Sequence, residues 1–249
     1  MDFTIEELSM NAWPAIKTVL YDGWIIRLAN GYSNRANSIN PIYPSKISLG
    51  KKVAYCEELF QRHNLLATYK LTDCDEHKAI DKKLEKMKYQ KIHETSIQVY
   101  SIPASIKDTK HDVVVSDEFS DQWIKSVVNF NKIEKKHILT FKTILANIAV
   151  EKIVVHKEVA GKIIGCGYCT IENNYAGVFD IVVNEKFRGK GYGREIVTAI
   201  LSEAAKRCAK KSYLQVMLNN PVALHLYEKL GYREIYKYWY RKAKLQSTG

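Results

Sequence analysis

The second half of the sequence predicts an α/β fold, and three consecutive features carry this prediction. A β-branched apolar run at 177–183 has the length and composition of a buried strand. The glycine-rich stretch 187–193 follows it directly, and apolar residues then recur at helical spacing over 196–208. Basic residues gather toward the end of this segment, as the helix dipole favours. A strand, a loop and a helix in this order are typical of layered α/β proteins.

The segments around this unit continue the alternation. Apolar residues alternate at 214–218, which predicts a strand. Pro221 suits the first turn of a short helix, and Gly231 suits its C-terminal end. The stretch 235–240 then forms a last strand. Upstream, apolar residues at helical spacing within 118–148 predict one or two helices that begin the second half.

The first half of the chain repeats features of the second half. The segment EKMKYQKI at 85–92 matches EKLGYREI at 228–235, at an offset of 143 residues. At an offset of 143–144 residues, a helix-like stretch at 52–63 falls opposite 195–207. A nearly constant offset over this span indicates a duplicated unit.

The boundary between the two copies is predicted after residue 104. Pro103 interrupts a polar stretch there. The chain then divides into a first lobe, residues 1–104, and a second lobe, residues 105–249. A length of 249 residues is compatible with one or two domains.

The composition is that of a globular protein. Hydrophobic residues make up 46% of the chain and charged residues 26%, which excludes a disordered or collagen-like protein. No apolar run approaches the roughly 20 residues that span a bilayer, and the first residues lack the basic region and apolar core of a secretory signal. The sequence therefore predicts a cytoplasmic protein with no membrane partner. The net charge of +11 favours an anionic partner or reflects a lysine-rich solvated surface.

Two of the five cysteines have the C-x-x-C spacing of metal and redox sites. Cys166 and Cys169 lie within a strand-like stretch at 162–171. Positions three apart on a strand face opposite sides of the sheet, and no second pair of cysteines or histidines lies nearby in the sequence to complete a tetrahedral site. An odd number of cysteines also argues against a disulfide framework. We therefore expect neither a metal site nor a redox site.

The loop Arg188-Gly-Lys-Gly-Tyr-Gly193 is the strongest functional signal in the sequence. It lacks the Gly-Lys-Ser/Thr of a Walker loop and the Gly-x-Gly-x-x-Gly of a dinucleotide-binding fold. A strand precedes the loop and a helix follows it, so its backbone N–H groups lie at a helix N-terminus. Such a position binds phosphate. The loop therefore predicts a site for a ligand that contains a pyrophosphate.

Three motifs in order resemble the GNAT superfamily of acetyl-CoA-dependent N-acetyltransferases. They are the strand Asp180-Ile-Val-Val183 with the loop Arg188–Gly193, then Asn220, then Leu226-Tyr-Glu-Lys-Leu-Gly-Tyr232. The motifs lie within residues 165–240. Upstream, three segments resemble the leading lobe of tandem GNAT proteins: Asn11-Ala-Trp-Pro, Asp22-Gly-Trp24 and Asn30-Gly-Tyr-Ser-Asn-Arg-Ala-Asn-Ser38. The resemblance implies two GNAT-like lobes, each a mixed, mostly antiparallel twisted sheet flanked by helices.

The resemblance also implies a site for acetyl-CoA as cosubstrate, without a metal. In GNAT proteins, backbone N–H groups at a bulge in the strand stabilise the oxyanion, and the loop with its helix dipole holds the pyrophosphate. The matching positions are Ile181, Val182, Val183, Arg188, Gly189, Lys190, Gly191, Tyr192, Gly193 and Arg194. Asn220 either contacts the pantetheine arm or caps the short helix that follows, where asparagine is favoured.

Tyr227 and Asp180 are the candidate catalytic residues. Tyr227 matches the family position of the acid that protonates the leaving thiolate, and a phenol with a pKa of about 10 stays mostly protonated at neutral pH. The alternative is a core tyrosine, since the chain has 16 tyrosines. Asp180 lies where some relatives have a carboxylate base, or it is a structural partner of a neighbouring strand. His225 is not paired with Tyr227, because residues two apart do not share a helix face.

The first lobe departs from these motifs. At the place of the glycine loop it has Pro44-Ser-Lys-Ile-Ser-Leu49, and at the place of Tyr227 it has Leu84. Without the glycines, the backbone cannot approach a phosphate closely, so we expect this lobe to bind no CoA. Its expected roles are to cover a sheet edge of the second lobe and to form one wall of the acceptor cleft. The candidates for that wall are Tyr32, Arg35 and Asn37.

These observations predict an N-acetyltransferase that moves the acetyl group from acetyl-CoA to a primary amine by direct attack in a ternary complex. The acceptor is expected to be a small-molecule or peptide amine, and the protein a monomer or homodimer. Nucleic acid is not expected as a partner of this enzyme. The alternative is a non-catalytic CoA-sensing or nucleic-acid-binding module that keeps the fold, which the net positive charge favours.

Overall fold

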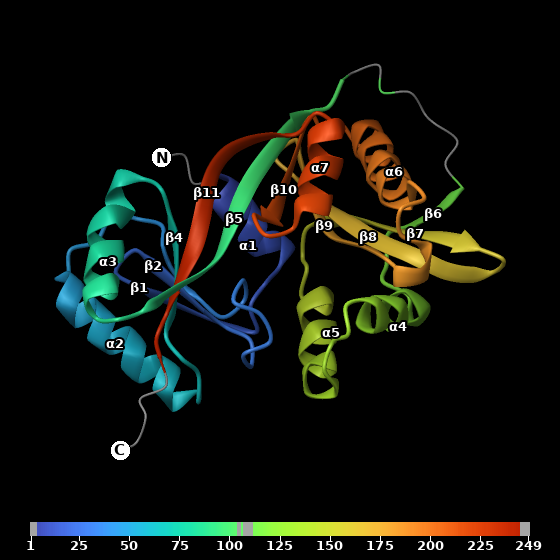
Figure 1. The fold of residues 1–249 in the computed structure, drawn as a ribbon. Coiled ribbons are helices and arrows are strands. Elements are labelled where there is room, and N and C mark those ends of the chain that lie inside the picture. The colour runs from blue at the N-terminus through green and yellow to red at the C-terminus, as the bar shows by residue number, and fades with distance from the viewer. Residues whose placement is uncertain (1–3, 104–105, 107–111, 245–249) are drawn as a thin grey trace.

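The strands of the described residues form one continuous mixed sheet (Figure 1). The computed structural model describes residues 4–103, 106 and 112–244. From one edge of the sheet to the other, the strands are β1 (Lys17–Tyr21), β2 (Trp24–Leu28), β3 (Ile39–Pro41), β4 (Thr68–Thr72), β11 (Arg233–Lys242), β5 (Gln90–Ser101), β10 (Lys211–Met217), β9 (Tyr175–Val183), β8 (Lys162–Glu172), β7 (Glu151–Val159) and β6 (Val113–Ser116). Helices pack on this sheet, so the predicted α/β class is confirmed. Within the described ranges, no helix has the length and apolar character that crossing a membrane requires.

Helices cover both faces of the sheet. On one face of the second-lobe half lie α1 (Thr4–Ala12), α4 (Asp121–Phe130) and α5 (Ile138–Ala146). On the opposite face lie α6 (Tyr192–Lys206) and α7 (Pro221–Lys229). In the first lobe, α2 (Leu49–Arg62) and α3 (Asp75–Lys86) share a third core with β2 and β4. Short 3₁₀ helices occupy Lys135–His137 and Glu185–Phe187. Helix α6 ends at Lys206, short of the predicted residue 208, and the positive φ of 64° at Cys208 is not helical.

The order of elements agrees with the duplication inferred from the sequence. The series α2, β4, α3, β5 of the first lobe corresponds to the series α6, β10, α7, β11 of the second lobe. In the described part of the chain, the last strand of each series pairs only with strands of the other lobe. Strand β5 lies between β10 and β11, and β11 lies between β4 and β5, side by side across the middle of the molecule (Figure 1). The first lobe therefore covers a sheet edge of the second, as expected. The boundary predicted between residues 104 and 105 falls outside the described residues.

Strands β9 and β10 separate at the centre of the sheet. Their parallel pairing ends at Val178 and Leu214, although both strands continue beyond these residues. On its other side β9 stays paired with β8 but contains a bulge, in which Asp180 and Ile181 lie opposite the single residue Gly167. Asp180 has a positive φ of 49°, which is uncommon for a residue other than glycine. The separation leaves one backbone edge of β9 open, and the bulge lies on that open segment.

Cys166 and Cys169 face opposite sides of the sheet, as predicted from their spacing. Cys166 belongs to the core beneath α4 and α5, and Cys169 belongs to the core beneath α6. Both thiols are free and buried, and burial raises the pKa of each to about 12. Over the described residues, no group of three or more His, Cys, Asp or Glu side chains could hold a metal ion. The two cysteines are therefore core residues.

Candidate active site

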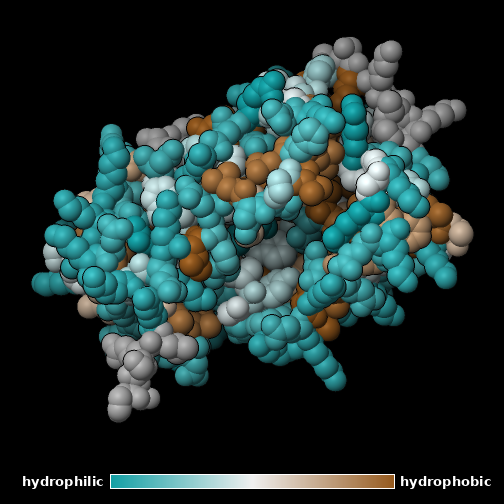
Figure 2. Space-filling model, in the orientation of Figure 1, coloured by the Kyte–Doolittle hydropathy of each residue, from teal (hydrophilic) through white to brown (hydrophobic). Residues whose placement is uncertain are grey.

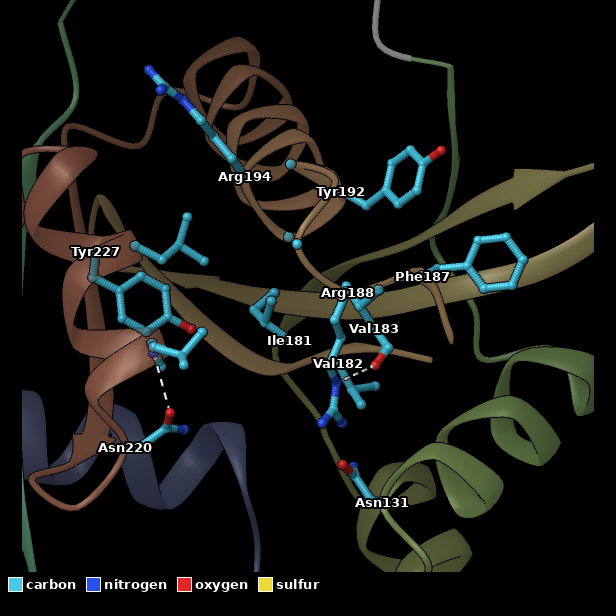
Figure 3. A pocket seen from close by; sticks show the side chains of 16 residues that line it. Asn131, Ile181, Val182, Val183, Phe187, Arg188, Tyr192, Arg194, Asn220 and Tyr227 are labelled. Atoms are coloured by element: carbon cyan, nitrogen blue, oxygen red, sulfur yellow. Dashed lines mark hydrogen bonds between the residues drawn. The ribbon is translucent and has the colours of Figure 1, made fainter. Parts of the chain in front are cut away.

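A cavity of about 500 Å³ opens where β9 separates from β10. It lies between β9, the loop before α6, and α7 (Figure 3). It is lined by Asn131, Ile181, Val182, Val183, Phe187, Arg188, Gly189, Gly191, Tyr192, Gly193, Arg194, Asn220, Val222, Ala223, Leu226 and Tyr227. Every residue predicted to bind the cosubstrate lines this cavity except Lys190, whose ammonium lies 5.6 Å from the Phe187 ring centroid. We call this space the loop cavity.

The loop at the start of α6 has the geometry of an anion-binding site. Gly189 and Gly191 have positive φ values of 76° and 84°, and a Cβ atom on either residue would meet nothing within 4 Å. None of the backbone N–H groups from Gly189 to Gly193 donates a hydrogen bond to another described residue. These free donors and the N-terminus of α6 lie along the loop cavity. The residues present therefore fit the pyrophosphate of acetyl-CoA.

Arg188 connects the loop to the strand. Its Nε donates a 3.1 Å hydrogen bond to the carbonyl oxygen of Val183 (Figure 3). This bond orients the guanidinium within the loop cavity while its two terminal nitrogens keep their donors. A guanidinium held in this way can bind a phosphate through paired hydrogen bonds.

Tyr227 lies on α7 with its hydroxyl directed into the loop cavity (Figure 3). The residue is 8% exposed, and its ring packs edge-on against Tyr232 with centroids 5.7 Å apart. Burial raises the pKa of Tyr227 to about 12. The phenol is therefore protonated throughout the physiological pH range, but it is a weaker acid than an exposed tyrosine. His225 is exposed, in agreement with the expectation that it does not pair with Tyr227.

Asn220 caps α7. Its side-chain oxygen accepts a 3.1 Å hydrogen bond from the backbone N–H of Ala223, as Figure 3 shows. An N-terminal cap of this kind stabilises a helix by about 1 kcal/mol. Asn220 also lines the loop cavity. The cap is therefore observed, and contact with the pantetheine arm stays a prediction.

Asp180 lines a different cavity, of about 600 Å³, on the other side of the bulge. Its neighbour Ile181 lines the loop cavity, so consecutive residues of the bulge reach two separate spaces. Burial raises the pKa of the Asp180 carboxyl to about 6, and the positive charge of Arg35 opposes this shift. The Oδ2 atom of Asp180 is buried and has no hydrogen-bond partner among the described residues. A carboxyl group with this pKa can accept a proton near neutral pH.

First-lobe residues form one wall of this second cavity. It is lined by Trp13, Gly31, Tyr32, Ser33, Asn34, Arg35, Ile92, His93, Thr95, Asp180, Gln215, Met217, Tyr238, Tyr240 and Lys242. Two of the three predicted wall residues, Tyr32 and Arg35, are among them. The prediction for Asn37 is wrong, because its side chain is buried and bonds to the backbone of Ala29 and Gly31. Figure 2 shows that the surface is hollowed near the centre of the face drawn in Figure 1.

In the first lobe, a protein carboxylate occupies the position that corresponds to the anion site. Asp22 accepts hydrogen bonds of 2.8–3.0 Å from the backbone N–H groups of Lys46 and Ile47, just before α2. It also pairs with the Lys52 ammonium at 3.3 Å. The two backbone donors hold the pKa of Asp22 below its usual value. Because a carboxylate already satisfies these N–H groups, the arrangement supports the expectation that the first lobe binds no CoA.

Several residues that line the two cavities were not predicted from the sequence. Asn131 ends α4 and lines the loop cavity, and no local pattern distinguishes it from other polar residues of the predicted helices. Val222 could have been predicted as a surface contact residue, because it is an apolar residue in the first turn of a short helix. In the structure its side chain is 81% exposed beside the loop cavity. Gln215 lies on β10 and reaches the second cavity only because β9 and β10 separate.

The parallel strands β9 and β10 separate at a bulge, and the glycine loop and Tyr227 line the cavity at this separation. This arrangement fits a GNAT N-acetyltransferase, the family that the sequence motifs resemble. The family model described as "Probable histone acetyltransferase Rv0428c C-terminal" matches residues 4–241. The chain belongs to this family of GNAT acetyltransferases.

Several similar proteins match this chain over most of its length. The "Uncharacterized N-acetyltransferase YobR" of Bacillus subtilis is 25% identical over 242 residues, which cover 95% of this chain and 96% of that protein. The GCN5-related N-acetyltransferase from Kribbella flavida superposes with a TM-score of 0.69 at 12% identity, covering 98% of this chain and 96% of that one. A tandem GNAT protein from the clavulanic acid biosynthesis pathway has a TM-score of 0.62 at 13% identity, with coverages of 84% and 76%. The two structural similarities show that the fold is shared.

One equivalent of acetyl-CoA is expected to bind per chain. The second lobe offers free N–H groups at Gly189–Gly193, whereas Asp22 already occupies the corresponding donors of the first lobe. Isothermal titration calorimetry of the full chain measures the stoichiometry. Two equivalent sites would contradict the assignment of CoA binding to the second lobe alone.

Replacing Gly191 with valine is expected to weaken acetyl-CoA binding by about tenfold or more. A β-branched side chain disfavours φ 84° by roughly 1–2 kcal/mol, so the free loop leaves the conformation that presents its N–H groups. Returning to that conformation on binding costs this free energy, and each 1.4 kcal/mol corresponds to about tenfold in affinity. The added Cβ also fills space along the loop cavity. Gly50→Val is the matched control, because Gly50 lies early in α2 with a Cβ position that is open and a φ outside the left-handed region. Equal affinities of the two variants would exclude the loop as the binding element.

Proposed function

We propose that the protein transfers the acetyl group of acetyl-CoA directly to a primary amine while both substrates are bound. The observation that carries this proposal is the bulge in β9, which puts Ile181 in the loop cavity and Asp180 in the second cavity. Two ligands that enter from opposite sides would meet at the backbone of this bulge. The described lining of the loop cavity includes no serine, cysteine or lysine that could carry the acetyl group covalently. Direct transfer therefore fits the lining residues better than an acetylated enzyme does.

Each element has one role in this proposal. The N–H groups and guanidinium groups of Arg188–Arg194 hold the pyrophosphate. Backbone N–H groups of Ile181–Val183 stabilise the negative charge that develops on the thioester oxygen. Asp180 takes a proton from the amine, directly or through a water molecule, and the hydroxyl of Tyr227 acts as the general acid that protonates the departing thiolate. Acetyl-CoA supplies the acetyl group as a substrate.

The two lobes divide the work in this proposal. Residues 105–249 bind acetyl-CoA and contain both candidate catalytic residues. Residues 1–104 supply strand β5 to the shared sheet and the wall of the second cavity that holds Tyr32 and Arg35. The comparisons favour this enzyme over a non-catalytic CoA-sensing or nucleic-acid-binding module.

The pH profile of kcat/KM for the amine is expected to fall as the pH drops below about 6. Asp180 acts as a base only when deprotonated, and its raised pKa of about 6 sets the midpoint of that limb. The titratable and charged groups around it are Tyr32, Arg35, His93, Cys166, Tyr168 and Lys242. Asp180→Asn is expected to lose this limb and to lower the rate by about 10²–10⁴-fold. An unchanged limb in the variant would assign it to another group.

Initial rates with both substrates varied test the order of events. Direct transfer in a ternary complex gives double-reciprocal lines that intersect. Parallel lines would indicate a covalent acetyl-enzyme and would contradict the proposal.

A further inference from the structure

The second cavity contains buried polar atoms that no other described residue satisfies. The Oδ2 atom of Asp180 and the Nε2 atom of Gln215 are buried without a hydrogen-bond partner in the described part of the chain. The other end of the Gln215 amide, Oε1, accepts a 2.9 Å hydrogen bond from the Tyr238 hydroxyl. Exchanging the two ends of the amide would still leave one without a partner. Because buried polar groups are nearly always paired, these atoms indicate a ligand with both donors and acceptors.

Arg35 brings an unpaired guanidinium to the same cavity. Its central carbon lies 5.6 Å from the Trp13 ring centroid and 5.7 Å from that of Phe179. Among the described residues, none accepts a hydrogen bond from this guanidinium, and no carboxylate lies within the 4.0 Å of an ion pair. A half-buried cation without such a partner is unfavourable. Arg35 is therefore available to an anionic group.

The guanidinium of Arg27, unlike that of Arg35, has its hydrogen bonds satisfied within the protein. Arg27 is buried, and its guanidinium donates to the backbone carbonyl oxygens of Met10, Trp13 and Arg35. Its donors are used to hold the first lobe together. Arg35 makes no such bonds and lines the cavity instead, so a purely structural role does not account for its position.

The charge and shape of the second cavity further restrict the chemical class of its ligand. Arg35 and Lys242 bring two cations to the lining, against the single carboxyl of Asp180. The field therefore favours a ligand with a negative group. Aromatic side chains supply apolar walls around the polar floor: Trp13, Tyr32, Tyr238 and Tyr240. A volume of about 600 Å³ is in the range of sites for small molecules.

We propose that the acceptor is an amine that carries a carboxylate, the chemical class of a free amino acid. Arg35 and Gln215 bind the carboxylate, and Asp180 faces the amine. The proposal rests on the proposed function of the same site. In the reaction the amine nitrogen forms a bond to the acetyl carbon, and the bond from that carbon to sulfur breaks. One proton passes from the nitrogen to Asp180, and the sulfur takes a proton from the hydroxyl of Tyr227 and leaves as the CoA thiol.

The test compares free amino acids with their amides as acceptors for the full chain. The amide keeps the same amine and side chain but removes the negative charge, and the rates are corrected for the fraction of free amine. A charge-assisted hydrogen-bonded contact predicts kcat/KM about 10–100-fold higher for the acid than for the amide. Free thiol released from acetyl-CoA is the readout. Peptides with a free N-terminus or a lysine, and a polyamine, complete the panel.

Variants of Arg35 test whether its guanidinium binds the carboxylate of the acceptor. Arg35→Met is expected to bring the acid-to-amide ratio close to one and to leave the affinity for acetyl-CoA unchanged. Arg35→Lys, which keeps the charge but not the planar fork, is expected to give an intermediate ratio and serves where the methionine variant does not fold. Arg62→Met, on the exposed end of α2, is the matched control and should keep the full ratio.

The outcomes separate this proposal from the proposed function. Thiol release with peptides or the polyamine, but no preference for amino acids over their amides, overturns the acceptor class and leaves the transferase standing. A preference that persists in both Arg35 variants also overturns it. If none of the amines causes release of free thiol from acetyl-CoA, both proposals are overturned.

Discussion

Replacing Tyr227 with phenylalanine is expected to lower kcat by about 10²–10⁴-fold, the range that general acid catalysis typically contributes. The hydroxyl points into the loop cavity and matters when the thiolate departs, so its loss raises the barrier of that step. The affinity for acetyl-CoA should change little, because the ring and its packing on Tyr232 are kept. Steady-state kinetics and calorimetry on the same preparation measure both quantities.

Tyr232→Phe is the matched control. It removes a hydroxyl from the partner ring, where it bonds to Ser212 Oγ at 2.7 Å. Loss of this bond should lower the free energy of unfolding by about 0.5–1.5 kcal/mol and leave kcat unchanged. If Tyr227→Phe keeps the kcat of the unmodified chain, another group or a water molecule protonates the thiolate. If the Tyr227→Phe variant unfolds, the main role of Tyr227 is to stabilise the core.

Removing residues 1–104 is expected to abolish folding of the second lobe. Strand β5 lies between β10 and β11, so its loss leaves two long strand edges without hydrogen-bond partners. The same deletion removes α1 and Trp13 from the core that contains Phe179. Residues 105–249 alone should aggregate or lack a cooperative thermal transition. Circular dichroism and the fraction remaining after centrifugation provide the measurement.

Complementation is the control for this deletion. Because the last strand of each lobe pairs with the other lobe, the fragments 1–104 and 105–249 made together should assemble and regain acetyl-CoA binding. A second lobe that folds alone and transfers acetyl groups at the full rate would show that the shared sheet is dispensable.

The glycine loop was predictable because all its determinants are local. A strand, three glycines and an amphipathic helix follow each other within 177–208, and the structure places them around one cavity. Tyr227 followed from a motif on the next helix. The same locality explains why the duplicated elements could be matched by offset alone, since each copy keeps its own order of helices and strands.

The pairing of β5 and β11 with strands of the opposite lobe could not be predicted from the sequence. Period-two patterns identify a segment as a strand, but the choice of neighbour depends on packing across the whole sheet. The second cavity depends on this pairing between lobes, because its lining residues come from four strands and two loop segments of both lobes. Asp22 was missed for a similar reason: it lies 24 residues before the N–H group of Lys46 that it satisfies. The error at Asn37 arose because a polar residue beside Arg35 bonds to the loop backbone instead of lining the cavity.

A single-turnover experiment tests direct transfer most plainly. The full chain is loaded with one equivalent of acetyl-CoA labelled in the acetyl group, mixed with the acceptor panel described above, and quenched at intervals. Direct transfer predicts that label passes from CoA to an amine without any labelled protein, and that label stays on CoA when no amine is added. Label bound covalently to the protein before it reaches the amine, or label that remains on CoA with every amine of the panel, would contradict it.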